Sequence, residues 1–213
     1  MRRLIVVAVV LVALVGVDAL ARASAESAIE SGVKAKVQGV ASVQAHIHSF
    51  PFTGRLLLAG QVSTLDLELD QVVGHGIDVA ALGVHASGLE LDRNVLLGKH
   101  HVRITGVHAV TVRATITEAE IRTLTHADVH LVPGHATVTI AGRTLDAAVQ
   151  VSGGRIRLSV GSLPALTVPA PDAGLFPCAI QAEVVAGALE ASCTSDHLPQ
   201  IVIDAVGSVD LQR

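Results

Sequence analysis

The sequence is almost free of aromatic residues: among 213 residues it has no Trp, no Tyr and three Phe. Proteins that bind single-stranded nucleic acids stack the bases on aromatic side chains, so this composition disfavours such a function. Charge is also scarce, at 16% of residues. Beyond residue 25 acidic residues outnumber basic ones, because only three of the 15 Lys and Arg and one of the 19 Asp and Glu fall earlier. No nucleic-acid partner is therefore expected, and any lipid binding must rely on apolar contact.

Motifs for catalysis are missing as well. The chain has no Gly-x-Ser-x-Gly nucleophile elbow and no His-Glu-x-x-His zinc motif. Gly74-His75-Gly76 lacks the rest of a phosphate-binding loop. Asp66, Glu68 and Asp70 suggest general acid–base chemistry, but their spacing of two places them on one solvated face of a strand. The sequence therefore predicts a protein that is not an enzyme, with no catalytic residues and no cofactor.

Histidine is common, with 11 residues, and it is the most frequent metal ligand in proteins. The groups that could chelate a metal are His46 with His48, His100 with His101, and His126 with His130 and His135. None has the ligand spacing of a zinc site, and most fall on polar strand faces or in turns, so no metal site is expected. His108 is polar on an apolar strand face, and we interpret it as a hydrogen-bonded or rim residue.

What the sequence has in abundance is alternation of apolar and polar residues, within a composition that is 50% hydrophobic. From Val102 to Ile116 nearly every second residue is apolar or small, and the segment from Leu65 to Leu69 alternates in the same way. A period of two is typical of a strand with one buried face. The phase slips near Leu82 and again beside Gly88. Each slip indicates a β-bulge, so we predict a curled sheet with a large apolar face.

The remaining elements are predicted from periodicity, capping and turn residues. Helices are expected at residues 21–37, 53–59 and 118–124, the last because Thr117-Glu118-Ala119-Glu120 is a capping box. Further strands are expected at residues 43–48, 77–91, 128–132, 136–140, 145–151 and 156–160. The prolines between residues 164 and 177 indicate an extended crossing segment. The predicted fold class is α+β, with a curved antiparallel β-sheet wrapped against an N-terminal helix and short helices at strand ends.

Residues 1–21 differ from the rest of the chain. Arg2 and Arg3 precede an apolar run from Leu4 to Val17, and Ala19-Leu20-Ala21 follows as a small-x-small cleavage pattern. As a helix the run to Leu20 spans about 26 Å, slightly less than a ~30 Å hydrocarbon core. A cleaved signal peptide and a retained membrane anchor both fit. Either predicts export of one domain, residues 22–213, to the cell envelope at the outer face of the plasma membrane or in the periplasm, or its secretion.

The two cysteines, Cys178 and Cys193, flank a segment that can form a hairpin turning at residues 184–187. One register places the cysteines opposite each other and also pairs Ile180 with Ala191, so that the apolar pairs share the face of the cysteines. In a chain expected to be exported, this agreement favours a disulfide over two buried thiols.

Two of the three Phe flank one proline, in Phe50-Pro51-Phe52, shortly before Leu56-Leu57-Leu58. Such a cluster is distinctive in a chain so poor in aromatic residues. It fits a hydrophobic plug that closes one end of the core, and it also fits a mouth or lid that contacts acyl chains.

The order of these elements resembles the LmeA family of actinobacterial phospholipid-binding envelope proteins. The similarity runs from the N-terminal apolar segment through the Phe-Pro-Phe element at residues 46–52, the leucine-rich helix with Gly60 behind it, the strand-then-helix unit at 110–124 and the hairpin at 176–194. Ser49 stands where the family usually has glycine, and the cysteine pair is not a general family feature. The resemblance implies a fold similar to tubular lipid-binding domains and phospholipid binding in the envelope, and it supplies no catalytic residues.

We therefore expect an exported protein that binds phospholipid acyl chains in an apolar groove or tunnel, in support of lipid or lipoglycan homeostasis. Phospholipid is the expected partner, and the N-terminal segment contacts the membrane if it is uncleaved. The alternative is a structural envelope protein that has a filled core and acts through protein–protein contacts at a sheet edge. An exported hydrolase that uses histidines is the least supported reading. The residues expected to line the lipid site are Phe50, Phe52, Leu56, Leu57, Leu65, Leu67 and Leu69.

Overall fold

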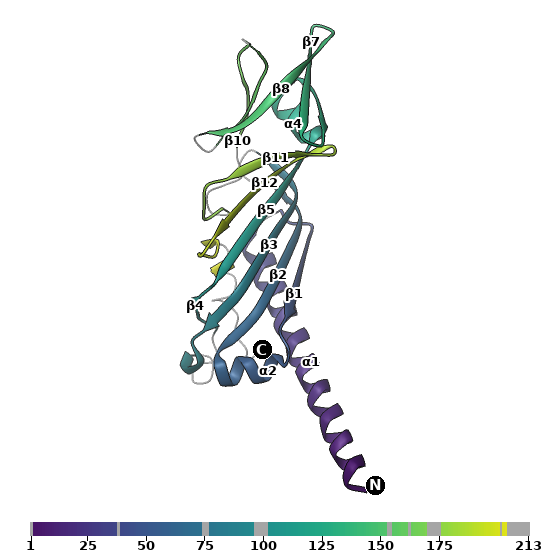
Figure 1. The fold of residues 1–213 in the computed structure, drawn as a ribbon, viewed down its shortest axis with the longest axis vertical. Coiled ribbons are helices and arrows are strands. Elements are labelled where there is room, and N and C mark those ends of the chain that lie inside the picture. Colours follow the sequence, from purple (N-terminus) through teal and green to yellow (C-terminus); the bar gives the residue numbers. More distant parts are fainter. Residues whose placement is uncertain are drawn as a thin grey trace.

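The structure, a computed structural model, describes residues 2–37, 39–73, 77–95, 102–152, 155–161, 163–169, 176–200 and 202–203. Its helices are α1 (Arg2–Lys36), α2 (Phe52–Gly54), the π-helical turn η1 (Arg55–Ala59) and α4 (Glu118–Thr125). Its strands are β1 (Ser42–His48), β2 (Gln61–Val73), β3 (Asp78–Leu91), β4 (Ile104–Gly106), β5 (Ala109–Thr117), β6 (Asp128–Val132), β7 (His135–Ile140), β8 (Arg143–Ser152), β9 (Arg155–Ser159), β10 (Leu166–Pro169), β11 (Gln181–Val185) and β12 (Ala188–Ser195). The predicted α+β class, with curled antiparallel sheets and an N-terminal helix, is confirmed (Figure 1).

Helix α1 runs without a break from the apolar N-terminal segment into the helix predicted at residues 21–37. Its sequence is rich in Ala, the strongest helix former, and neither its many Val residues nor Gly16 and Gly32 interrupt it. Its N-terminal half extends beyond α2 and away from the sheets, while its C-terminal half lies beside β1 (Figure 1). Within the part of the chain that the structure describes, no helix has the length and apolar content needed to cross a membrane.

The C-terminal half of α1 protects the edge of the larger sheet. Glu30 Oε1 accepts a hydrogen bond from the backbone N–H of Ala45 at 3.0 Å, and Glu26 Oε1 accepts one from Ile47 at 2.8 Å. Four residues of helix rise about 6 Å, which nearly matches the ~6.6 Å between alternate residues of a strand. The two glutamates therefore pair two edge donors that would otherwise be open to another strand. The predicted packing of this helix against the sheet is confirmed.

The larger sheet has the strand order β1-β2-β3-β5-β12-β11, with β4 paired to β3. Its longest strands are β2, with 13 residues, and β3, with 14. Buried positions in β3 jump from Val79 to Leu82 and from Ala86 to Leu89, where the sequence pattern slips. However, β2 jumps at the facing positions, so the register between the two strands is constant. A bulge adds a residue to one strand only, and the prediction of bulges between these two strands is wrong.

At each slip one of the two strands carries a residue in the left-handed region: Gln71 in β2, with φ 52°, lies at the first slip, and Gly88 in β3, with φ 62°, lies at the second. A shift of register does occur beside the second slip, between Glu90 and Leu91, where β3 pairs with the short strand β4. The strand predicted from residue 102 to 116 is consequently divided into β4 and β5. His108 lies between them and is exposed, as expected for a rim residue.

A second sheet, ordered β10-β9-β8-β7-β6, lies at the end of the molecule opposite α2 (Figure 1). It forms its own core with α4 and the adjoining ends of the larger sheet, separate from the core beneath α1. The capping box is present, since Thr117 Oγ1 accepts from the backbone N–H of Glu120 at 3.2 Å. The strands at 128–160 were predicted, but not their separation into a second sheet. Part of the predicted crossing segment, Leu166–Pro169, is strand β10 and pairs with β9; residues 170–175 lie outside the described part of the chain.

The terminal hairpin contains the predicted disulfide, with 5.8 Å between the Cα atoms of Cys178 and Cys193. Its register is not the predicted one: Ala191 pairs with Ala182, two residues along from Ile180. The hairpin turns tightly at Ala186-Gly187, where Gly187 has φ 68°. Val184 and Val185, which the prediction placed in the turn, therefore belong to β11. A shift of two residues keeps every side chain on its face, so alternation alone could not distinguish the registers.

Candidate functional site

The inner face of the larger sheet is a continuous aliphatic surface. One row of paired residues crosses five strands, from β1 to β12, and consists of Ala45, Leu67, Val84, Val112 and Cys193. All of these side chains are buried. The two neighbouring rows are apolar from β1 to β5, and on β12 they end in Ser195 and Ala191. Such a surface makes only dispersion and hydrophobic contacts, which are the contacts that a hydrocarbon chain can make.

The described part of the protein already covers this face from two sides. From α1 and the residue just after it, Ala21, Ala25, Ile29, Val33 and Val37 pack on this face. The C-terminal residues packed on it are Phe176, Cys178, Ile180, Leu198 and Val202. The disulfide joins the second group to β12, because Cys193 lies on the inner face of that strand. The inner face is therefore enclosed between the helix and a strap at residues 176–180, which we call the C-terminal strap.

The seven residues predicted to line a lipid site fall into two groups. Leu65, Leu67 and Leu69 point to the inner face and are 5%, 2% and 2% exposed. Phe52 is buried in the same core, and Leu56 packs partly against it. Phe50 and Leu57 instead lie outside, at 71% and 43% exposure, together with Leu58 at 79%. The Phe-Pro-Phe element thus contributes one ring to the core and presents the other at the surface.

Asp18 fixes the position of the Phe-Pro-Phe element on α1. Its Oδ2 accepts a hydrogen bond from the backbone N–H of Phe52 at 2.9 Å, and its Oδ1 accepts one from Thr53 at 2.6 Å. These are donors at the start of α2, which have no partner within the helix. The N–H groups of Thr53 and Phe52 hold the pKa of Asp18 below its usual value, because they stabilise the carboxylate. Asp18 therefore joins the point where α1 leaves the body to the end of the larger sheet.

The outer face of the larger sheet is polar, as predicted for Asp66, Glu68 and Asp70. Asp66 lies between two histidines on neighbouring strands: His48 Nε2 is 3.2 Å from its Oδ2, and His85 Nδ1 contacts its Oδ1. A hollow of about 460 Å³ lies beside them. It is lined by Asp66, Leu67, Glu68, Gly83, Val84, His85, Thr111 and Arg113. Gly83 is paired with the polar residues Glu68 and Arg113 on the neighbouring strands, and because it has no side chain it leaves the space that forms this hollow.

The histidines do not assemble a metal centre in the described part of the chain. No group of three or more His, Cys, Asp or Glu there has a geometry that could hold a metal ion. His46, His130 and His135 are exposed, and His130 and His135 contact the carboxylates of Glu118 and Asp146. The pair at residues 100–101 lies outside the described residues.

Sequence reasoning missed the polar side chains that hold the fold around the inner face. No tertiary role was predicted for Asp18, Glu26 or Glu30. In the structure Asp18 bonds the start of α2, and Glu26 and Glu30 bond the edge strand β1. Their spacing of four residues on one helix face was the available signal, but helix periodicity does not reveal which strand a helix will lie against.

Comparison with known proteins places this fold in a family. A family model described as LmeA-like phospholipid-binding matches residues 16–210, nearly the whole chain. Comparison with curated proteins and with solved structures found no match. The family match agrees with the resemblance carried by the Phe-Pro-Phe element, the strand-then-helix unit and the terminal hairpin. The chain belongs to the LmeA-like phospholipid-binding family.

Proposed function

We propose that the protein holds the acyl chains of a phospholipid against the inner face of the larger sheet, as a binding protein and not as an enzyme. The observation that carries this proposal is the aliphatic row from Ala45 to Cys193, enclosed by α1 and the C-terminal strap. Transfer of one methylene from water to such a surface contributes about 0.8 kcal/mol. Burial of a few acyl carbons therefore gives useful affinity without any charged contact.

The burial of Leu65, Leu67 and Leu69 determines how a lipid would reach this face. Because these side chains are already covered, an acyl chain must displace part of the cover. The C-terminal strap is the better candidate for displacement, since α1 is held by Glu26, Glu30 and Asp18 through backbone hydrogen bonds. The disulfide limits that displacement, because Cys178 stays attached to β12.

We also propose that the protein acts in the cell envelope, in support of lipid or lipoglycan homeostasis. Support comes from the export pattern of residues 1–21, with Arg2 and Arg3 before the apolar run, and from the disulfide, which persists in oxidising compartments. If the N-terminal segment is uncleaved, it attaches the protein to the membrane. If it is cleaved, the domain beginning near residue 22 carries lipid in solution.

Native mass spectrometry of the purified full chain tests the proposal. We expect species heavier than the polypeptide by the mass of a phospholipid, and loss of that mass after delipidation with detergent. Incubation of the delipidated protein with phosphatidylglycerol or phosphatidylcholine vesicles should restore it. A polypeptide mass alone, both as purified and after incubation, would contradict lipid binding.

The second candidate function is a structural envelope protein whose core is filled by its own side chains. The observation in its favour is the low exposure of the same leucines, 2% for both Leu67 and Leu69. This candidate predicts no lipid mass in the same experiment. It also predicts that inner-face substitutions alter stability alone.

A further inference from the structure

Three large apolar side chains are exposed together at the end of the molecule formed by α2 and η1. Phe50, Leu57 and Leu58 lie within nine residues of sequence and are 71%, 43% and 79% exposed. We call them the apolar tip. Elsewhere in the described body, outside α1, the exposed large apolar residues are 38–57% exposed, and no three of them fall within nine residues of sequence: they are Val73, Val132, Ile140, Leu145, Leu163 and Ile203. Apolar side chains gathered at one end in this way mark an interaction site more often than scattered ones do.

The apolar tip lies where the most apolar part of the chain leaves the body. Asp18 bonds the backbone of Phe52 and Thr53, so residues of α1 before Asp18 project beyond α2 at this same end (Figure 1). The exposed large apolar residues on that part of α1 are Val12, Leu14, Val15 and Val17, and Leu20 follows just after Asp18. The tip and the projecting helix therefore form one apolar surface, joined by the Asp18 hydrogen bonds.

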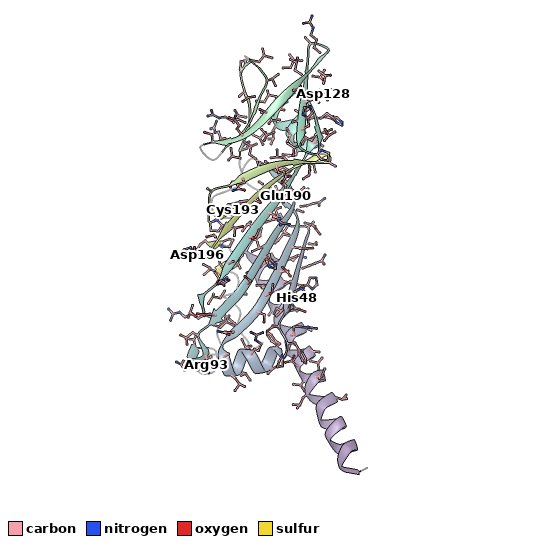
Figure 2. All side chains as sticks on the ribbon, in the orientation of Figure 1. His48, Arg93, Asp128, Glu190, Cys193 and Asp196 are labelled. Atoms are coloured by element: carbon pink, nitrogen blue, oxygen red, sulfur yellow. A yellow bond between two sulfur atoms is a disulfide. The ribbon has the colours of Figure 1, made fainter. Side chains whose placement is uncertain are left out.

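Two arginines lie beside the apolar tip although the chain as a whole is acidic. Arg55 follows Phe52 within α2 and η1 and donates to Ser63 Oγ. Arg93 donates to the backbone carbonyl of Leu58, and Figure 2 shows it at the end that carries α2. The nearby Asp92 carboxylate already accepts from the backbone N–H groups of Asn94 and Val95. Guanidinium groups beside exposed apolar side chains suit a surface of hydrocarbon bordered by phosphates.

We propose that the apolar tip docks on a phospholipid bilayer, with Phe50, Leu57 and Leu58 among the acyl chains and with Arg55 and Arg93 at the phosphate level. This inference rests on the proposed function, because a protein that takes phospholipid needs a way to meet the bilayer that supplies it. Docking at this end places the buried Phe52, at the end of the inner face, next to the bilayer. Apolar contact supplies most of the affinity, and the arginines add a preference for anionic lipid.

The absence of Trp and Tyr makes a direct test available. A Leu58→Trp variant of the full chain carries one indole fluorophore, and a Leu145→Trp variant carries one on β8, at the opposite end of the molecule (Figure 1). Each is mixed with phosphatidylcholine vesicles that contain about 30% phosphatidylglycerol, which gives the surface a negative potential, with and without brominated acyl chains. We expect the emission of Leu58→Trp to shift to shorter wavelength and to be quenched by bromine, and that of Leu145→Trp to do neither. A Phe50→Trp variant repeats the measurement should Leu58→Trp fold poorly.

The charge requirement is tested on the same reporter. In the Leu58→Trp background, Arg55→Gln and Arg93→Gln should each weaken binding to the anionic vesicles about fivefold, with little effect on vesicles of phosphatidylcholine alone. Unchanged emission from both tip reporters with vesicles overturns the proposal, whether the protein binds through α1, binds a protein partner or binds nothing. Native mass spectrometry of the purified protein tests the proposed function separately, because it detects bound phospholipid whether or not the tip docks. A protein that carries phospholipid but keeps its tip in water refutes docking alone.

Discussion

Asp18 of α1 accepts a hydrogen bond from the backbone N–H of Thr53, with 2.6 Å between Oδ1 and the nitrogen. The two residues are far apart in sequence, and the contact joins the apolar N-terminal helix to the first turn after the Phe-Pro-Phe element. It attaches α1 to α2 at the end of the molecule that carries the apolar tip. The chemistry of the contact also makes it sensitive to pH.

The stability contributed by Asp18 should be lost in acid. Hydrogen bonds from Thr53 and Phe52 lower its pKa below the ordinary value of 3.8, so the folded state binds its proton less readily than the unfolded state does. The contribution is therefore complete above pH ~4 and falls as the pH drops through the lowered pKa. Urea unfolding of the wild type and of Asp18→Asn, from about pH 2 to about pH 6, measures this contribution, because Asp18 changes from its protonated to its ionised form within that range. The two stabilities should converge at low pH, and a constant difference would show that ionisation of Asp18 is irrelevant.

Glu118 should stabilise the junction between the two sheets. Its Oε2 accepts from the backbone N–H of Leu131 at 2.8 Å, and its Oε1 is 2.7 Å from Nη2 of Arg122. The Leu131 hydrogen bond is the main cause that lowers the pKa of Glu118. Glu118→Ala leaves the Leu131 donor without its acceptor and should cost about 1–3 kcal/mol of unfolding free energy. Glu118→Gln keeps an acceptor and should cost less, whereas Glu183→Ala, at an exposed position of β11, should have little effect. Equal losses for all three variants would contradict this role.

Removal of the disulfide should destabilise the whole domain. Cys178 and Cys193 are 15 residues apart, and closing a loop of that length contributes about 3 kcal/mol by the chain-entropy estimate. The double variant Cys178→Ser, Cys193→Ser should therefore unfold at lower urea concentration than the oxidised wild type, and reduction of the wild type should have a similar effect. An unchanged midpoint would mean that the hairpin and the C-terminal strap are held by packing alone.

Two glycines of β3 should respond in opposite ways to the same substitution. Gly88 has φ 62°, and a Cβ there would lie 2.8 Å from Cβ of His108, so Gly88→Ala should cost roughly 1–2 kcal/mol for the left-handed conformation alone. Gly83 is in ordinary strand conformation with nothing within 4 Å of an added Cβ, so Gly83→Ala should stabilise by up to about 1 kcal/mol. Thermal unfolding followed by circular dichroism compares them. Similar shifts in melting temperature for both would contradict the left-handed conformation and the close contact of Gly88.

Alternation predicted most of the strands because one face of each is buried and the other is solvated, as at Leu65, Leu67 and Leu69. The capping box at Thr117 and the disulfide were predicted for equally local reasons. The hairpin register was not, since a shift of two residues leaves each side chain on its face. The bends of β2 and β3 were located but misassigned, because a sequence shows a slip in one strand without showing whether its partner slips too.

The site was predictable only in part, for a related physical reason. Leu67 and Leu58 are both leucines in apolar contexts, yet one is 2% exposed and the other 79%. Hydrophobicity indicates that a side chain gains from burial, but not what will cover it. Leu67 is covered by tertiary packing that involves α1 and the C-terminal strap. The polar contacts of Asp18, Glu26 and Glu30 depend on the same long-range packing.

The central claim is that phospholipid acyl chains occupy the inner face of the larger sheet. A Phe176→Trp variant tests it most directly, because Phe176 packs on that face, belongs to the C-terminal strap, and would be the chain's single indole. The variant is delipidated, loaded with brominated or unbrominated phosphatidylglycerol, separated from vesicles and compared at equal lipid mass. The account predicts strong quenching of the brominated complex. Equal emission from the two complexes, with lipid mass present in both, would place the lipid elsewhere and contradict it.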